Sequence, residues 1–250
     1  MMFNRVALIG LPRRGVFVME RRSHAIVVDT TTAVLLGPGD EYRVGHPVDG
    51  GDDGTVLDVV PSLLEESIGD VRGRIGRLEP RDHLAVCLLT RALRKGDVDH
   101  LQAEDATLLL LASLARAFAR PWREPRYRLG PVQRRRVEQA RMLLASSPSK
   151  RWDLRGLGQA LGCSPFHLAR QFRAGTGESI ARYVLRLRMA VAVERLAEGE
   201  EDLGRLALAT GFAHHSHFSA RFRTVFGITP TEAREMLDKR RLTALYALVS

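Results

Sequence analysis

Arginine, histidine and serine side chains recur at helical spacing in two segments of the C-terminal half of the chain. On the first expected helix, the outward positions include Phe166, Ala169, Arg170 and Arg173. A guanidinium can bond O6 and N7 of a guanine together, at about 1–3 kcal/mol of discrimination, or it can bind a phosphate. These side chains therefore indicate contact with nucleic acid, and Arg173 is the better candidate for phosphate.

The second segment presents a different set of polar side chains. Its exposed candidates are His214, His215, Ser216, Ser219, Arg221 and Arg223. Imidazoles at positions 214 and 217 have a spacing that fits a metal, but no third ligand is nearby in the sequence. We expect neither a metal nor a cofactor here, and we expect the histidines to bond base edges or phosphates.

The elements that position these side chains form an internal repeat. The first copy is LGQALGCSPFHLARQFRAGTG, residues 157–177, and the second is LALATGFAHHSHFSARFRTVFG, residues 206–227. Each has a small residue (Ala160 or Ala209) where a second helix would approach closely, and then a glycine suited to a turn. Apolar residues four apart follow, at 168/172 and 218/222, which would fix the second helix to a core. Each copy therefore predicts a helix-turn-helix, with second helices near 164–173 and 213–224.

A long helix is expected to join the two copies. Residues 178–197 would span roughly 30 Å at 1.5 Å per residue. Successive major grooves on one face of DNA are about 34 Å apart. One chain could thus place both second helices in adjacent grooves.

Residues 211–234 closely resemble the signature of the AraC/XylS family of bacterial transcription regulators, with the sequence GFAHHSHFSARFRTVFGITPTEAR. Residues 181–196 are similar to that family's linker helix, with the sequence ARYVLRLRMAVAVERL. The resemblance covers about residues 132–238. It implies base-facing positions at Phe166, Ala169 and Arg170. The family usually has arginine directly after its Phe-Ser pair, whereas this chain has Ala220 and then Arg221, so Arg221 would turn by roughly 100° about the helix. The second copy is therefore expected to be the weaker reader.

The first sixty residues predict short strands separated by turns, including a turn at 12–14. The fold class that we expect is α+β: a short antiparallel, partly cupin-like unit with helices, followed by an all-α tandem helix-turn-helix domain. GPGDEYRVGHPV, residues 37–48, resembles a cupin-like sensing domain. The His-x-His pair of metal cupins is missing, which counts against a cupin-type enzyme. Candidates for lining a small-molecule pocket are Phe17, Met19, Tyr42 and His46.

Residues 61–119 predict helices, with an apolar stripe of residues 108, 111, 114, 115 and 118. The stripe would either cover the sheet or form a homodimer through the 83–118 helices. The domains that we expect are therefore 1–60 (sensing), 61–119 (helical), 120–131 (linker), 132–240 (DNA binding) and 241–250 (tail).

Charge is distributed unevenly along this 250-residue chain. Residues 1–119 hold 14 basic and 17 acidic side chains, whereas residues 120–250 hold 24 and 12. A basic half joined to a slightly acidic one favours a polyanion-binding module with a second unit attached. No apolar run approaches the roughly 20 residues that a membrane helix needs.

We therefore predict a non-enzymatic, sequence-specific regulator in the bacterial cytoplasm, associated with the nucleoid. Its partners would be double-stranded DNA, RNA polymerase and a small-molecule effector, and it would not contact a membrane. The alternatives are an architectural DNA binder without sequence preference and a cupin-type enzyme fused to a DNA-targeting module. A further alternative is an N-terminal half that only dimerises.

Overall fold

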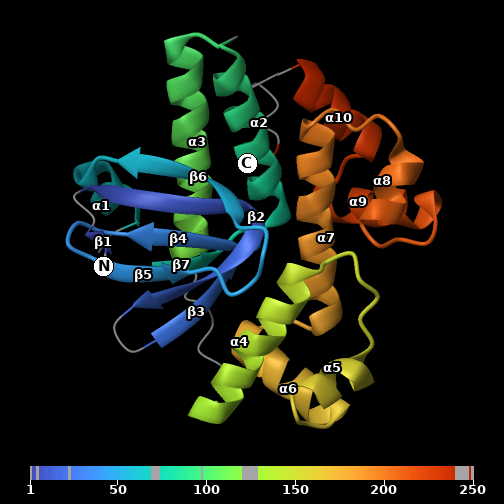
Figure 1. Ribbon diagram of the computed structural model, residues 1–250. Coiled ribbons are helices and arrows are strands. Elements are labelled where there is room, and N and C mark those ends of the chain that lie inside the picture. The colour runs from blue at the N-terminus through green and yellow to red at the C-terminus, as the bar shows by residue number, and fades with distance from the viewer. Residues whose placement is uncertain are drawn as a thin grey trace.

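The computed structural model describes residues 2–3, 6–21, 24–68, 74–96, 98–119, 129–239 and 248. Figure 1 shows a curled sheet with two long helices beside it, and a second group of helices arranged around one long helix, α7. This is the α+β architecture that the sequence predicts. Most of the expected linker at 120–131 and of the tail at 241–250 lies outside the described residues.

A seven-stranded antiparallel sheet forms the N-terminal unit. Its strands are β1 (Met2–Phe3), β2 (Ala7–Arg21), β3 (His24–Asp29), β4 (Thr32–Leu36), β5 (Glu41–Gly45), β6 (Asp52–Val59) and β7 (Arg74–Arg77). Strand β2 pairs with β3, β4, β5 and β6, and β4 also pairs with β7. Because one strand of 15 residues has four partners, the sheet curls around it.

Two features of this sheet differ from the expectation. The expected turn at residues 12–14 is a register shift inside one strand, between Pro12 and Arg14, where β2 pairs with β6. An irregular position of this kind tolerates a proline, which lacks an N–H for the ladder. The sheet also continues past residue 60, because β7 pairs with β4.

Three helices accompany the sheet: α1 (Pro61–Ile68), α2 (Pro80–Lys95) and α3 (His100–Ala119). The apolar stripe of α3 packs inside the chain, with Leu111, Leu114 and Phe118 7%, 0% and 4% exposed, respectively. Phe118 lies against Gly76 of β7, where an added Cβ would be 2.9 Å from its ring. The stripe therefore covers the sheet, and Leu108 is the member that stays exposed.

The described residues of the C-terminal half form seven helices. They are α4 (Pro131–Ser146), α5 (Leu154–Ala160), α6 (Pro165–Thr176), α7 (Ile180–Ala197), α8 (Leu203–Ala209), α9 (His215–Phe226) and α10 (Pro230–Lys239). Within the described residues, no helix has the length and apolarity required to cross a membrane.

The hydrophobic core does not stop at the boundary between the two halves. One buried cluster contains Leu84 and Leu88 of α2 together with Val193 of α7 and Phe222 of α9. A second cluster joins Val16 and Val27 of the sheet to α4 and α6. Helix α7 thus packs against both the sheet unit and the second helix-turn-helix.

Candidate nucleic-acid interface

Helices α5 and α6 form the first helix-turn-helix, and a side chain caps the start of each. The Asp153 carboxylate accepts a hydrogen bond from the Gly156 N–H at 2.7 Å, and the Ser164 hydroxyl accepts one from the His167 N–H at 3.3 Å. Pro165 follows Ser164 as the first residue of α6, a position that tolerates a missing N–H. Leu168 and Phe172 are 0% exposed, so they attach α6 to its core as expected.

The candidate reading residues of α6 share one face. At about 100° per residue, Ala169, Arg173, Phe166 and Arg170 fall within roughly 100° of each other around the helix axis. Phe166 is 72% exposed, and both arginines are exposed. Neither guanidinium makes an ion pair or a hydrogen bond with a described residue. This face therefore combines two available positive charges with an apolar ring.

The second helix-turn-helix, α8 and α9, repeats the arrangement. Gly211 has a φ of +83°, and an added Cβ would lie 2.4 Å from the Ser149 carbonyl oxygen, so the turn requires glycine. Phe218 and Phe222 are both 0% exposed, matching Leu168 and Phe172.

One detail of the expected repeat is wrong. The close approach between paired helices occurs at Gly158 and Ala207, not at Ala160 and Ala209. A Cβ added at Gly158 would lie 3.3 Å from the nitrogen of Pro165, the first residue of α6, and Ala207 is 0% exposed. Two residues along a helix turn it by about 200°, so the alanines at 160 and 209 face away from this contact.

Polar side chains of α9 divide between two faces. His215, Ser219, Arg223 and Ser216 fall within roughly 100° of one another, and His214 is the residue that precedes the helix. Ser219 and His215 are in hydrogen-bond contact at 3.2 Å. Arg221 lies off this face and donates to His217 Nε2 at 3.3 Å. Arg221 and His217 therefore share a different side of α9 from the other polar side chains.

Helix α7 holds the two helix-turn-helix units at its opposite ends (Figure 1). Its 18 residues correspond to about 27 Å. Arg188 of α7 donates to the carbonyl oxygens of Pro148 at 2.9 Å, Lys150 at 3.0 Å and Gly211 at 3.1 Å. It therefore joins the end of α4 to the turn of the second unit, and it is not available to a base.

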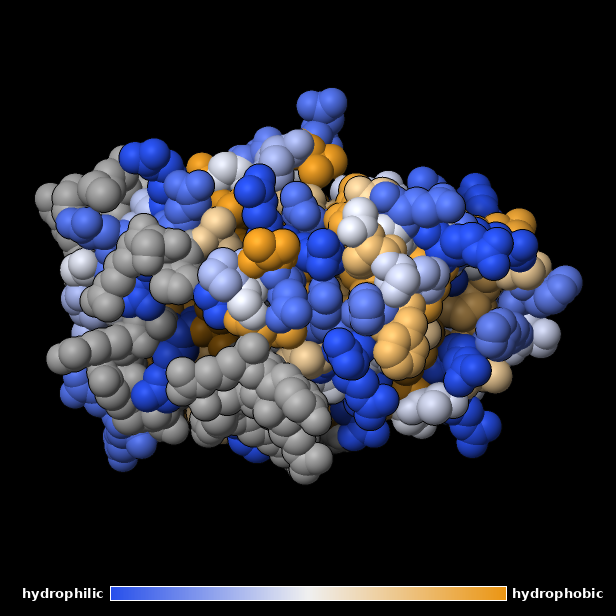
Figure 2. All heavy atoms as spheres, turned by 90° about the horizontal axis from the view of Figure 1, so that it is seen from below, coloured by the Kyte–Doolittle hydropathy of each residue, from blue (hydrophilic) through white to orange (hydrophobic). Residues whose placement is uncertain are grey.

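Figure 2 views the molecule from the end at which α5 and α6 lie in Figure 1. Its visible surface is mainly hydrophilic, with small hydrophobic patches between polar side chains. A polar surface with isolated apolar groups suits DNA, which offers phosphates along its backbone and methyl groups in its major groove.

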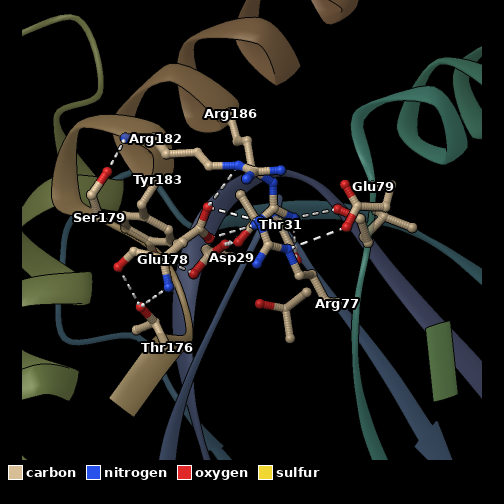
Figure 3. Close-up of polar contacts among 12 residues, drawn as sticks. Asp29, Thr31, Arg77, Glu79, Thr176, Glu178, Ser179, Arg182, Tyr183 and Arg186 are labelled. Carbon is tan, nitrogen blue, oxygen red and sulfur yellow. Dashed lines mark hydrogen bonds and ion pairs between the residues drawn. The ribbon is translucent and has the colours of Figure 1, made fainter. Parts of the chain in front are cut away.

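A buried polar network connects this module to the sheet unit (Figure 3). Asp29, at the end of β3, accepts from Arg141 of α4 at 2.8 Å and from the Tyr183 hydroxyl of α7 at 2.7 Å. Burial alone would raise the pKa of Asp29, but Arg141 and the hydroxyls of Thr31 and Tyr183 outweigh it and lower that pKa. The Asp29 carboxylate therefore stays charged, and its hydrogen bonds join the sheet unit to α4 and α7.

A second part of the network lies at the start of α7. Glu178, 6% exposed, accepts from Arg77 of β7 and from Arg186 of α7, both at 2.7 Å. Arg186 also donates to the carbonyl oxygens of Thr31 and Leu78. Two segments of the sheet unit, residues 29–31 and 77–78, thus contact α7 and the residue that precedes its cap.

The four candidate pocket residues lie in the sheet unit. Phe17, Met19 and Tyr42 belong to one small apolar cluster. His46 contacts the Phe17 ring, with centroids 6.2 Å apart, and pairs with Asp52. A cavity of about 590 Å³ lies elsewhere, between β2 and α7, and its lining includes Arg13, Arg14, Leu187, Glu194 and Glu198. None of the four candidates lines it.

The structure also brings together a group that sequence reasoning missed: His83, Cys87 and Glu194, all buried. The spacing of His83 and Cys87, four residues apart on an expected helix, was the available signal. Glu194 lies 107 residues further along the chain, so only the fold reveals the third member.

Residues 157–236 match the family model described as a helix-turn-helix domain. The chain is 25% identical over 211 residues to the probable transcriptional regulator LumQ of Photobacterium leiognathi, covering 80% of this chain and 81% of that protein. It is 30% identical over 155 residues to a putative AraC-like transcription regulator of Streptomyces lividans, covering 62% and 44%. It is 38% identical over 71 residues to the transcriptional activator RhaS of Escherichia fergusonii, covering 28% and 26%. The chain thus spans less than half of the last two relatives.

These relatives are transcription regulators. Their similarity, the matched domain and the doubled arrangement of helices around α7 agree on what the C-terminal half is. It is a double helix-turn-helix domain, and it is similar to the domains of AraC-type transcription regulators.

Proposed function

We propose that the protein regulates transcription by reading a bipartite DNA site with α6 and α9. The observation that carries this proposal is the placement of two exposed polar helices at the ends of one 18-residue helix. The length of α7, about 27 Å, is shorter than the roughly 34 Å between successive major grooves. Both helices therefore engage adjacent grooves if the DNA bends toward the protein.

We assign different tasks to two arginines of α6. Arg170 reads a base edge, and Arg173 neutralises a phosphate. The remaining candidates, Phe166 and Ala169 in α6 and His214, His215, Ser216, Ser219, Arg221 and Arg223 at α9, complete the interface. Arg221 contacts the DNA backbone in this proposal, since it lies off the face shared by its neighbours.

A matched pair of variants tests this assignment. Arg170→Ala should weaken binding to the preferred site by about 5- to 150-fold and binding to random DNA much less, since it removes about 1–3 kcal/mol of base discrimination. Arg173→Ala should weaken both equally and lower the slope of log affinity against log salt by about 1. Fluorescence anisotropy across a salt series measures both. Equal losses on the two DNAs for Arg170→Ala would contradict its base-reading role.

Control by the N-terminal unit is the second part of the proposal. The cavity between β2 and α7 has walls from both halves, so a small molecule held there would change how the sheet unit bears on α7. Phe17, Met19, Tyr42 and His46 remain candidates for a separate pocket in the sheet unit. Binding of either kind would act on DNA affinity through the Asp29 and Glu178 contacts.

A homodimer through the α2 and α3 region also belongs to the proposal. Leu101 and Leu108 of α3, seven residues apart on one helical face, are 69% and 49% exposed. Exposed apolar pairs at this spacing suit a helix from a second copy. Sedimentation of the full chain tests the dimer.

The regulator would act at the bacterial nucleoid in the cytoplasm, and RNA polymerase is the proposed partner at the promoter.

A further inference from the structure

Three buried side chains with metal-binding atoms meet where helix α2 of the N-terminal unit packs on α7. His83 and Cys87 are four residues apart in α2, so they share one face of that helix. Glu194 reaches them from α7. Their residues are 2%, 1% and 4% exposed, respectively. Side chains from two parts of the chain thus converge at a buried site, next to the cavity that Glu194 also lines.

The three ligand atoms lie close to the spacing around a single small ion, except that Cys87 and Glu194 are too near each other. Cys87 Sγ lies 2.8 Å from Glu194 Oε1, and His83 Nε2 lies 3.5 Å from the same oxygen. All three ligand atoms lie within 4.8 Å of one another. A tetrahedral zinc ion, with bonds of about 2.0–2.3 Å, holds its ligand atoms roughly 3.3–3.6 Å apart. A small rotation of the Cys87 side chain away from Glu194 and toward His83 would satisfy these distances.

The histidine has an unsatisfied donor and acceptor. Neither ring nitrogen of His83 makes a hydrogen bond with a described residue, although the ring is almost fully buried. Leaving such a group unpaired costs about 1–3 kcal/mol. Glu194 Oε1 lies 3.5 Å from His83 Nε2, an ion-pair distance without hydrogen-bond geometry. A metal bound to Nε2 would remove this defect at one nitrogen.

The surrounding charges select the class of ion. A thiolate, a carboxylate and a neutral imidazole carry two negative charges together, so a divalent cation leaves the buried site neutral. The other oxygen of Glu194, Oε2, faces Arg14 Nε at 3.6 Å and Arg13 Nη1 at 3.9 Å. Each guanidinium also has a carboxylate partner of its own, Asp53 for Arg13 and Glu198 for Arg14, so the two arginines leave the charge balance at the three ligands unchanged. Sulfur disfavours magnesium and calcium, which take oxygen ligands.

We propose that His83, Cys87 and Glu194 bind a divalent, thiolate-preferring transition metal ion of the zinc class, which ties α2 to α7. Burial raises the pKa of the Cys87 thiol, and Glu194 adds to that rise, so the thiol holds its proton until the ion arrives. Binding then forms a metal–sulfur bond and releases that proton to solvent. Since α7 carries both helix-turn-helix units, occupancy of this site would stiffen the contact through which the N-terminal unit acts on DNA.

Cobalt(II) is the probe, because a cobalt–thiolate bond gives a charge-transfer band in the near ultraviolet and tetrahedral cobalt absorbs in the visible. The full-length protein has two cysteines, Cys87 and Cys163, which makes Cys163→Ser a matched control. We expect one equivalent of Co²⁺ to produce the bands in the native protein and in Cys163→Ser. Glu194→Gln should bind at least ten times more weakly, and Cys87→Ser should give no charge-transfer band.

Absence of the bands at saturating Co²⁺, or their loss in Cys163→Ser with retention in Cys87→Ser, would overturn the proposal. The Cys163→Ser protein decides even if Cys87→Ser does not fold, because Cys87 is then the remaining thiol. Zinc should displace cobalt and raise the melting temperature of the native protein and Cys163→Ser but not of Cys87→Ser. None of these measurements involves DNA, so they are independent of the proposed regulatory function.

Discussion

Replacing Asp29 with asparagine would test how the two halves are joined. The substitution removes the negative charge that accepts hydrogen bonds from the buried side chains of Arg141 and Tyr183. Asp29 is 0% exposed and Arg141 is 1% exposed. Removing one partner of such a pair costs about 3–5 kcal/mol, since the other charge stays buried without compensation. Arg141 retains Glu138 at 3.1 Å, whose carboxylate is 30% exposed. We therefore expect the free energy of unfolding to fall by about 3 kcal/mol, at the lower end of that range.

Urea denaturation of the full chain measures this loss as a lower midpoint at an unchanged slope. Asp238→Asn is the control: Asp238 lies 3.4 Å from Arg91, and its side chain is 51% exposed. Such a surface pair contributes about 0–1 kcal/mol. If Asp29→Asn cost no more than Asp238→Asn, the network would not stabilise the junction, and the reasoning would be refuted.

Two further predictions use the same denaturation assay. Asp29 and Glu194 have pKa values below the ordinary 3.8 and 4.5, because their charged and hydrogen-bonded partners outweigh burial. The stability that these two carboxylates contribute is complete above those ordinary values and is lost as pH falls through the folded-state pKa. The free energy of unfolding should therefore drop below about pH 4, and it should drop less steeply in Asp29→Asn. A free energy of unfolding that does not change with pH would contradict this. Gly211→Ala should lower the free energy of unfolding more than Gly199→Ala does. Both glycines have a positive φ, but of the two only Gly211 would bring an added Cβ against a backbone oxygen. Equal losses of stability would show that the close approach does not matter.

The helix-turn-helix repeat was predictable from sequence because its signals are local. Turn glycines, a Ser-Pro start and aromatic residues four apart all act within about twenty residues. The error at Ala160 and Ala209 has the same origin, since two small residues lie near one turn and spacing alone does not say which one meets the partner helix. Gly158 and Ala207 are distinguished by their burial, which only packing reveals.

The junction was not predictable, because its members are far apart in sequence. Asp29 ends a strand and ordinarily reads as a turn residue, yet it contacts Arg141 and Tyr183, 112 and 154 residues away. The same holds for the apolar stripe of α3, which fits a dimer and a sheet cover equally well as a pattern. Only the position of β7 decides that Phe118 packs on Gly76 within the chain.

Selection of bound sequences from a random DNA pool, with the purified full-length protein at physiological salt, tests the central claim most directly. We predict enrichment of two short boxes about one helical turn apart, because α6 and α9 lie at opposite ends of α7. Inverted or repeated copies of that pair would also reveal the dimer. Strong binding at low salt without enrichment of any sequence would contradict bipartite reading and would favour an architectural DNA binder.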